Sequence, residues 1–204
     1  AEEYENVFAA VGVHPHDAEA LPENWLAQIE ELSKHPKVVA LGEMGLDYFK
    51  DYSPRDVQRR AFIEQLELAG SLELPVIVHN RDSDDDMVEI MTEYGPGNGV
   101  MHCFTSDLQM AETMVGLGYV ISFSGIATFG NTTVEEAVRG LDIQHLMVET
   151  DCPFLAPAPK RGKTNEPSFV RYTAEKVAAL KGLSISEVEE MTTRNAVDLF
   201  RLPV

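Results

Sequence analysis

The sequence has little cysteine and no long apolar run. Its two cysteines, Cys103 and Cys152, are too few for a disulfide framework, so we interpret both as free thiols. No stretch approaches the roughly 18 apolar residues of a membrane span, which predicts a chain that does not cross a membrane. The acidic opening AEEYEN lacks the basic and apolar segments of a secretory signal, so the expected location is the cytoplasm.

Positive charge is also scarce. The chain carries 16 lysines and arginines against 34 aspartates and glutamates, a formal net charge of −18. Because neutralisation of phosphates supplies most nonspecific affinity for nucleic acid, broad electrostatic binding to DNA is not expected, and any contact must be local. Lys160, Arg161 and Lys163 form one basic cluster that offers such a contact, although a solvated basic loop has the same composition.

The length of 204 residues and the hydrophobic content of 44% suit a single domain, 1–204, with one sizeable core. Short apolar runs alternate with amphipathic stretches, which is typical of βα units around a parallel sheet. The predicted strands are residues 7–13, 38–43, 75–79, 99–104, 119–125 and 146–151. The predicted helices are residues 24–35, 53–74, 84–95, 107–118, 133–141, 166–182 and 186–201. The fold class is therefore α/β.

Two of these helices have local start signals. Ser53 before Pro54 resembles an N-cap followed by a proline at the first helical position. Ser186 and Glu189 have the spacing of a capping box. We therefore expect the two helices to begin at these serines.

Polar residues at the strand ends favour a barrel over an open sheet. Glu43 ends the second apolar run, His79 the third and Asp151 the sixth, while His102 lies late in the fourth. In β/α barrels the chemistry sits at the carboxyl ends of the strands. The pattern thus predicts a TIM-type barrel that gathers these four side chains.

Each of the four residues also has a purely structural alternative. His79 and His102 can be hydrogen-bonded structural histidines, Glu43 a solvent-exposed acid, and Asp151 an N-cap or turn carboxylate. Together, however, two imidazoles and two carboxylates match the donors that zinc, manganese and related ions prefer. We predict that Glu43, His79, His102 and Asp151 bind one or two divalent metal ions that activate water, while a free carboxylate takes its proton.

Three further side chains lie beside these positions. Arg81 is two residues beyond His79 and shares its face of the strand. His14, in the sequence His-Pro-His, is expected either to contact substrate or to form a structural turn. Cys103 is expected to point away from His102, as neighbours in a strand do, and to serve in packing.

Seven motifs in this order resemble the TatD family of metal-dependent deoxyribonucleases and related hydrolases. They are GVHPH (12–16), GEMGLDY (42–48), PVIVHNRD (75–82), HCFTS (102–106), ETDCPFL (149–155), RGKTNEP (161–167) and NAVDLF (195–200). Their order and approximate spacing extend over nearly the whole chain.

This resemblance implies roles for particular residues. Glu43 bridges two metal ions, His79 and His102 complete one site, and Asp151 serves the other while it orients the attacking water. His14 and Arg81 face the substrate. Arg161 and Asn165 lie near the mouth of the barrel, where Arg161 or its neighbours meet a phosphate backbone, and loop bracing is the alternative role of their motif. The resemblance leaves zinc, manganese, magnesium and nickel open as the metal.

The resemblance also implies an incomplete barrel. The family begins with a strand that carries a His-x-His pair, followed by a helix and a second strand, and this chain starts after them. About six of the eight strands are therefore expected, with one metal ion weakly held.

Three functions are compatible with these residues. The first is a phosphodiester hydrolase, a deoxyribonuclease that acts on DNA ends or single strands through a local contact. The second keeps the metal site but hydrolyses amide, ester or aminoacyl bonds. The third is a catalytically incompetent fragment that binds metal and partners.

Overall fold

The computed structural model describes residues 1–203, which form two compact units. Unit 1 comprises Ala1–Val100 and Leu199–Pro203, and unit 2 comprises Met101–Asp198. The boundary falls inside a strand, β4 (Gly99–Met101). The expectation of one domain over 1–204 stays a prediction.

Six strands alternate with helices along the chain, which confirms the α/β class. The strands are β1 (Ala9–Val11), β2 (Val38–Asp47), β3 (Val76–Arg81), β4, β5 (Tyr119–Phe123) and β6 (Leu146–Val148). They are hydrogen-bonded in their order along the chain, and the pairs β1 with β2, β2 with β3 and β5 with β6 are parallel. All six predicted strands are present; five have both ends within three residues of the predicted ones, and β2 extends four residues beyond its predicted end.

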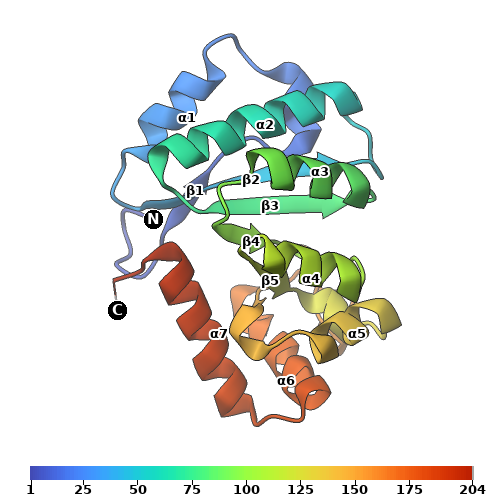
Figure 1. Cartoon of the computed structure of the whole chain (residues 1–204). Coiled ribbons are helices and arrows are strands. Elements are labelled where there is room, and N and C mark those ends of the chain that lie inside the picture. The colour runs from blue at the N-terminus through green and yellow to red at the C-terminus, as the bar shows by residue number, and fades with distance from the viewer. Residues whose placement is uncertain (204) are drawn as a thin grey trace. The chain divides into compact units, whose positions relative to one another are not determined.

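In unit 1, three helices cover one face of the first three strands (Figure 1). They are α1 (Trp25–Ser33), α2 (Arg55–Leu72) and α3 (Asp84–Tyr94), and a short 3-10 helix, η1 (Pro15–Ala20), follows β1. The apolar core of this unit is formed by Leu41, Met44, Leu46, Phe62, Leu66, Val76, Val78, Met87 and Ile90. Burial of these side chains is the main force that holds α2 on β2.

In unit 2, α4 (Leu108–Gly116) packs beside β5, and α6 (Val170–Lys181) packs against β6 and α5 (Thr132–Gly140). The last helix, α7 (Ile185–Phe200), is held to the start of β6 by Asn195, whose Nδ2 donates to the carbonyls of Ile143 and Leu146 at 2.9 and 2.7 Å. The remaining elements are the 3-10 turns η2 (Gly125–Thr128), η3 (Ile143–His145), η4 (Ala158–Lys160) and η5 (Pro167–Phe169). The buried apolar side chains of this unit include Met114, Tyr119, Ile121, Phe123, Val134, Ala137, Val138, Leu146, Val177 and Val188.

Two buried glutamines connect α2 to the strands that carry the polar residues. Gln65 accepts from the N–H of Val13 at 2.7 Å and donates to its carbonyl at 3.2 Å. Gln58 likewise accepts from the N–H of Asp47 at 2.8 Å and donates to its carbonyl at 3.2 Å. Because both amides pair with the N–H and the carbonyl of one backbone residue, α2 fixes the chain where β1 and β2 end.

Both predicted helix starts are wrong in detail. Pro54 rather than Ser53 is the N-cap of α2, and the buried Ser53 hydroxyl instead donates to the carbonyl of His16 and accepts from the N–H of Glu19. The capping box of α7 lies two residues earlier than predicted, since Ser184 and Glu187 make the reciprocal hydrogen bonds. A capping box does begin this helix, but the segment contains two serine–glutamate pairs with the required spacing, and the pair at 184 and 187 forms it.

None of the helices formed by residues 1–203 combines the length and apolar character that crossing a membrane requires.

Candidate functional site

The polar residues of unit 1 are carried by the adjacent strands β2 and β3. The strands pair with Gly45 opposite His79, so both present residues at the same level of the sheet. The prediction that Glu43 ends its strand is wrong, because β2 continues to Asp47 and Glu43 lies in its middle. Glu43 is the one half-buried position in an otherwise buried stretch of β2 from Ala40 to Asp47, and the pairing register shifts at this point. This irregularity lets an acid stand in an apolar strand.

The imidazole of His79 lies between two carboxylates. Its Nδ1 is 2.9 Å from Oε1 of Glu43, and its Nε2 is 3.2 Å from Oδ2 of Asp47. The side chain of Asp47 is only 1% exposed, whereas that of Glu43 is 33% exposed. Metal-binding histidines commonly donate their second ring N–H to a carboxylate. Asp47 is placed for that orienting role, which leaves the Nδ1 edge of His79 and Glu43 on the open side.

Asp47 and His16 were not among the predicted site residues. His16 Nε2 lies 2.8 Å from Oδ2 of Asp47, and the other oxygen accepts from the N–H groups of Phe49 and Lys50 at 3.1 and 2.9 Å. Burial alone raises the pKa of Asp47, but the N–H of Lys50, the hydrogen bond from His16 and the charge of His79 outweigh it and hold this pKa below its usual range. Asp47 is therefore a carboxylate. The sequence GLDY (45–48) could have indicated Asp47, because it continues the strand past Glu43 to a second acid.

One ring nitrogen of His14 is engaged by the backbone. Its Nδ1 accepts a hydrogen bond from the N–H of His16 at 3.2 Å and caps η1. In a neutral imidazole with an accepting Nδ1, the proton is on Nε2. That atom lies 3.5 Å from Oε1 of Glu43. Of the two roles predicted for His14, the structural turn is therefore present, and the Nε2 side of the ring also faces Glu43.

Unit 2 carries a second group of the same type. His102 follows β4, and Glu149 and Asp151 follow β6. Nδ1 of His102 lies 2.8 Å from Oε1 of Glu149, and its Nε2 lies 3.6 Å from Oδ1 of Asp151. Oε1 of Glu149 is buried, and no donor among the described residues is aligned to hydrogen-bond it. A buried carboxylate oxygen beside an imidazole nitrogen fits a cation.

The prediction that Cys103 points away from His102 is wrong. β4 ends at Met101, and Cys103 has a φ of 45°, so strand alternation does not apply to it. Its Sγ lies 3.0 Å from Oγ of Ser124 and within 4.8 Å of ligand atoms of His102 and Glu149. The thiol is therefore part of the polar group in unit 2.

The loop that contains Asp151 is braced from within. Asn165 is buried, and its Nδ2 donates to the carbonyls of Thr150 and Phe154, each at 2.6 Å. Asp151 has a φ of 56°, a conformation that residues other than glycine seldom adopt. Asn165 therefore braces this loop, which is one of the two roles that the sequence left open for its motif. Arg161, by contrast, is exposed and stacks on Phe129, with Cζ 4.0 Å from the ring centre.

The donor groups of both units are suited to a divalent metal. In unit 1, one ligand atom each from His14, Glu43 and His79 lie within 4.8 Å of one another, and in unit 2 the same holds for His102, Cys103 and Glu149. Half-buried nitrogen and oxygen donors at such separations match the preferences of zinc and manganese. Each unit thus contains two of the four predicted ligands, and the binding of one ion by all four stays a prediction.

Tyr48, which follows Asp47, gives a pH-dependent signal from unit 1. Burial and the hydrogen bond to Asp86 raise the pKa of Tyr48 to about 12 from an ordinary value of 10.0. Since the folded pKa is the higher one, this stabilisation is complete below about pH 10 and is lost as the pH rises toward about 12. In an ultraviolet titration of the six tyrosines, we expect a late phase that Tyr48→Phe removes. The hydrogen bond with Glu93 also raises the pKa of Tyr94, but that signal is present in the unaltered chain and in the variant alike. An identical titration curve for the variant would contradict the assignment.

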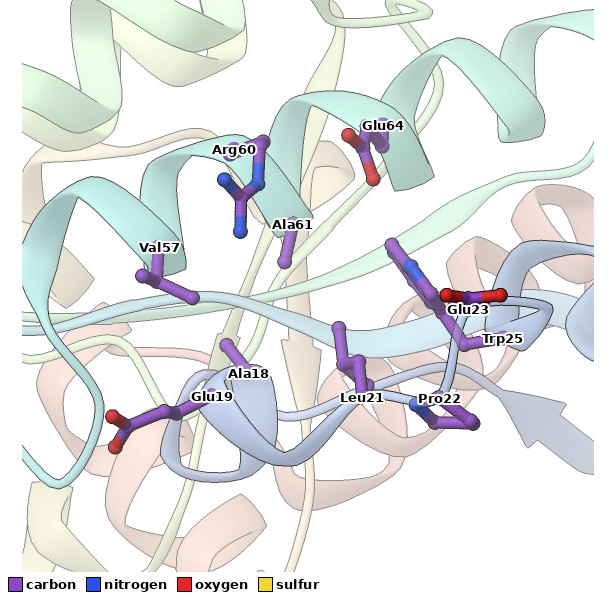
Figure 2. A pocket seen from close by; sticks show the side chains of 10 residues that line it. All are labelled: Ala18, Glu19, Leu21, Pro22, Glu23, Trp25, Val57, Arg60, Ala61 and Glu64. Carbon is purple, nitrogen blue, oxygen red and sulfur yellow. The ribbon is translucent and has the colours of Figure 1, made fainter.

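A separate pocket of about 270 Å³ lies between α2 on one side and η1 with the segment that follows it on the other (Figure 2). It is lined by Ala18, Glu19, Leu21, Pro22, Glu23, Trp25, Val57, Arg60, Ala61 and Glu64. Figure 2 shows Arg60 and Glu64 on the helix side and Trp25 and Leu21 on the loop side. None of the predicted site residues lines it, so the chemistry described above does not take place there.

The sequence matches a known family model over almost its full length. The model is that of TatD related DNase, and it covers residues 1–201. The chain is 48% identical over 204 residues to the uncharacterized metal-dependent hydrolase YabD of Bacillus subtilis, a match that covers 98% of this chain and 80% of that protein. It is 36% identical over 215 residues to a protein of Rahnella named 3'-5' ssDNA/RNA exonuclease TatD, covering 96% of this chain and 77% of the other.

A solved structure shows the same fold. The TatD homologue YJJV of Escherichia coli superposes with a TM-score of 0.93 and 32% sequence identity, covering 99% of this chain and 80% of that one. This likeness confirms the predicted TIM-type fold class. It also agrees with the strand order and with the alternation of strands and helices observed here.

Proposed function

The chain belongs to the TatD family of metal-dependent hydrolases, and on that premise we propose that it hydrolyses phosphodiester bonds in DNA. The observation that carries the proposal is His79, held between the half-exposed carboxylate of Glu43 and the buried carboxylate of Asp47. A histidine held in this way by a buried acid is the usual arrangement of a metal ligand. The name of the Rahnella relative supports a nucleic acid as the substrate.

We assign Glu43 and His79 in unit 1, and His102 and Asp151 in unit 2, as metal ligands. When bound, a divalent cation lowers the pKa of a coordinated water and polarises a phosphoryl oxygen. Asp47 holds the imidazole of His79 in orientation through its second ring nitrogen, and Glu149 lies 2.8 Å from Nδ1 of His102. Glu43 and Asp151 are the catalytic carboxylates, because each lies beside an imidazole and is exposed enough to accept a proton from water.

Three cationic or donating side chains are assigned to the substrate. The Nε2–H of His14 is directed to the side of Glu43 where a phosphoryl oxygen can accept it. Arg81 and Arg161 offer guanidinium groups that pair with phosphate. Asn165 acts on the substrate through the loop of Asp151, which its amide braces.

The proposal is tested by cleavage of a labelled single-stranded oligonucleotide by the chain. We expect cleavage with Mn²⁺, Zn²⁺, Mg²⁺ or Ni²⁺, loss of cleavage after chelation, and recovery when the metal is added back. Small ester, amide and aminoacyl substrates are measured in parallel under the same conditions. Turnover confined to those substrates, or metal binding without turnover of any substrate, would refute the nuclease assignment.

A further inference from the structure

Two large aromatic side chains are exposed in the turn that follows β2. Phe49 is 55% exposed and Tyr52 is 62% exposed, and they are only three residues apart. Lys50 lies between them, with Nζ at 5.6 Å from the ring centre of Phe49 and 5.8 Å from that of Tyr52. Arg81, at the end of β3, stacks on Phe49 with Cζ at 3.9 Å. These four residues form what we term the aromatic-basic patch.

The two cations of this patch are not neutralised. Neither Lys50 nor Arg81 forms an ion pair with a carboxylate among residues 1–203, although the chain has a net charge of −18. Asp51, which follows Lys50 in the chain, is engaged by Arg55 at 3.1 Å, and Asp47 is buried. A patch with unpaired cations over aromatic faces, in a strongly acidic chain, is complementary to an anionic ligand that has flat rings.

The patch adjoins the candidate metal group of unit 1. The ring of Tyr52 lies 4.8 Å from that of His16, and the ring of His16 lies 4.3 Å from that of His14. His14 in turn reaches Glu43, and Arg81 follows His79 by two residues on the same strand. A ligand that spans these contacts therefore passes from the patch directly to the carboxylates.

We propose that the aromatic-basic patch binds single-stranded nucleic acid, with bases stacked on Phe49 and Tyr52 and phosphates paired with Lys50 and Arg81. The proposal rests on the proposed function, because that function places the scissile phosphodiester at the adjacent metal group. Unpaired bases of any sequence offer a flat face to an aromatic ring, whereas bases in a duplex are already stacked on one another. The patch thus selects single strands without selecting a sequence.

Binding is measured in EDTA, where no cleavage occurs, by fluorescence anisotropy of labelled strands. The probes are a thymidine oligonucleotide of about 10 nucleotides, an abasic strand of the same length, and the duplex of the oligonucleotide with its complement. The abasic strand retains the phosphates and removes the rings that stack. Comparison of the three separates stacking from charge.

Phe49→Ala and Tyr52→Ala should each weaken binding of the thymidine strand about 10-fold or more and leave binding of the abasic strand unchanged. Lys50→Ala and Arg81→Ala should weaken both strands and lower the slope of log affinity against log salt by about 0.7 for each phosphate that is no longer neutralised. Tyr4→Ala is the matched control for an exposed ring, since Tyr4 is also 62% exposed in unit 1. Lys34→Ala is the control for removal of one exposed positive charge.

The proposal is overturned if the unaltered chain binds neither strand, if the ring variants lose the same affinity for the abasic strand, or if the duplex binds as well as the single strand. These outcomes are independent of catalysis. A chain that binds single strands through the patch and cleaves nothing keeps this inference and loses the nuclease assignment. A chain that cleaves equally well after Phe49, Lys50 and Tyr52 are replaced keeps the nuclease assignment and loses the inference.

Discussion

Glu43→Gln should lower metal-dependent turnover by about 100-fold or more, since loss even of groups that only orient a ligand costs 10- to 100-fold. The substitution keeps the shape of the side chain but removes the charge that would meet the cation, and an amide neither bridges ions nor accepts a proton well. Because the side chain is 33% exposed, we expect the free energy of unfolding to change by less than about 1 kcal/mol. The measurements are kcat/KM on the labelled oligonucleotide and the metal affinity by calorimetry.

Glu30→Gln is the matched control for this substitution. Glu30 is exposed and lies in α1, which also belongs to unit 1. Its replacement by glutamine removes one negative charge, as Glu43→Gln does. Its turnover and metal affinity should equal those of the unaltered chain. If Glu43→Gln retained both within twofold, the assignment of Glu43 as a ligand and catalytic carboxylate would be wrong.

Gly45→Ala should lower the free energy of unfolding by about 2–4 kcal/mol, the upper range for single substitutions. A Cβ at this position would lie 2.0 Å from the carbonyl oxygen of His79, and Gly45 has a φ of 140°, which side chains of other residues rarely tolerate. The clash is with backbone, so β3 must shift, and the imidazole of His79 shifts with it. Denaturant unfolding monitored by circular dichroism measures the first effect, and the metal affinity measures the second.

Gly70→Ala, the same change of residue type, should instead raise the free energy of unfolding. Gly70 lies inside α2, and a Cβ there would meet nothing within 4 Å. Alanine is favoured over glycine in a helix by about 0.5–1 kcal/mol, so this variant should be more stable than the unaltered chain. Equal stability of the two alanine variants would show that the close approach of β2 to β3 does not constrain the site.

The strands and helices were predictable because their residues repeat with the period of their secondary structure. Apolar runs located all six strands, and the amphipathic stretches located the helices. The end of β2 was not predictable from hydrophobicity, because Glu43 interrupts the apolar run while the strand pairing continues to Asp47. Burial of an acid inside a strand depends on partners from elsewhere in the chain, which a local pattern does not contain.

The supporting residues of the site were less accessible to prediction than its proposed ligands. His79 and Glu43 stand out as polar residues in apolar runs, and the structure does bring them together. Gln58 and Gln65 look like ordinary residues of a surface helix, yet they are buried because they satisfy backbone groups of Asp47 at the end of β2 and of Val13 just after β1. Their one signal is a spacing of seven residues, which places them on the same face of α2 as Phe62. Cys103 was misplaced because it follows the strand instead of belonging to it.

The four contacts of Asp47 restrict how protons can leave the site. Its two oxygens receive Phe49 N–H, Lys50 N–H, His16 and His79, which together occupy the about four lone-pair positions of a carboxylate. The carboxylate of Asp47 is thus saturated: it fixes the tilt of two imidazoles but has no acceptor position left for an incoming proton. If unit 1 takes part in hydrolysis as proposed, the half-buried carboxylate of Glu43, 33% exposed, is therefore the acceptor that leads a released proton to bulk water.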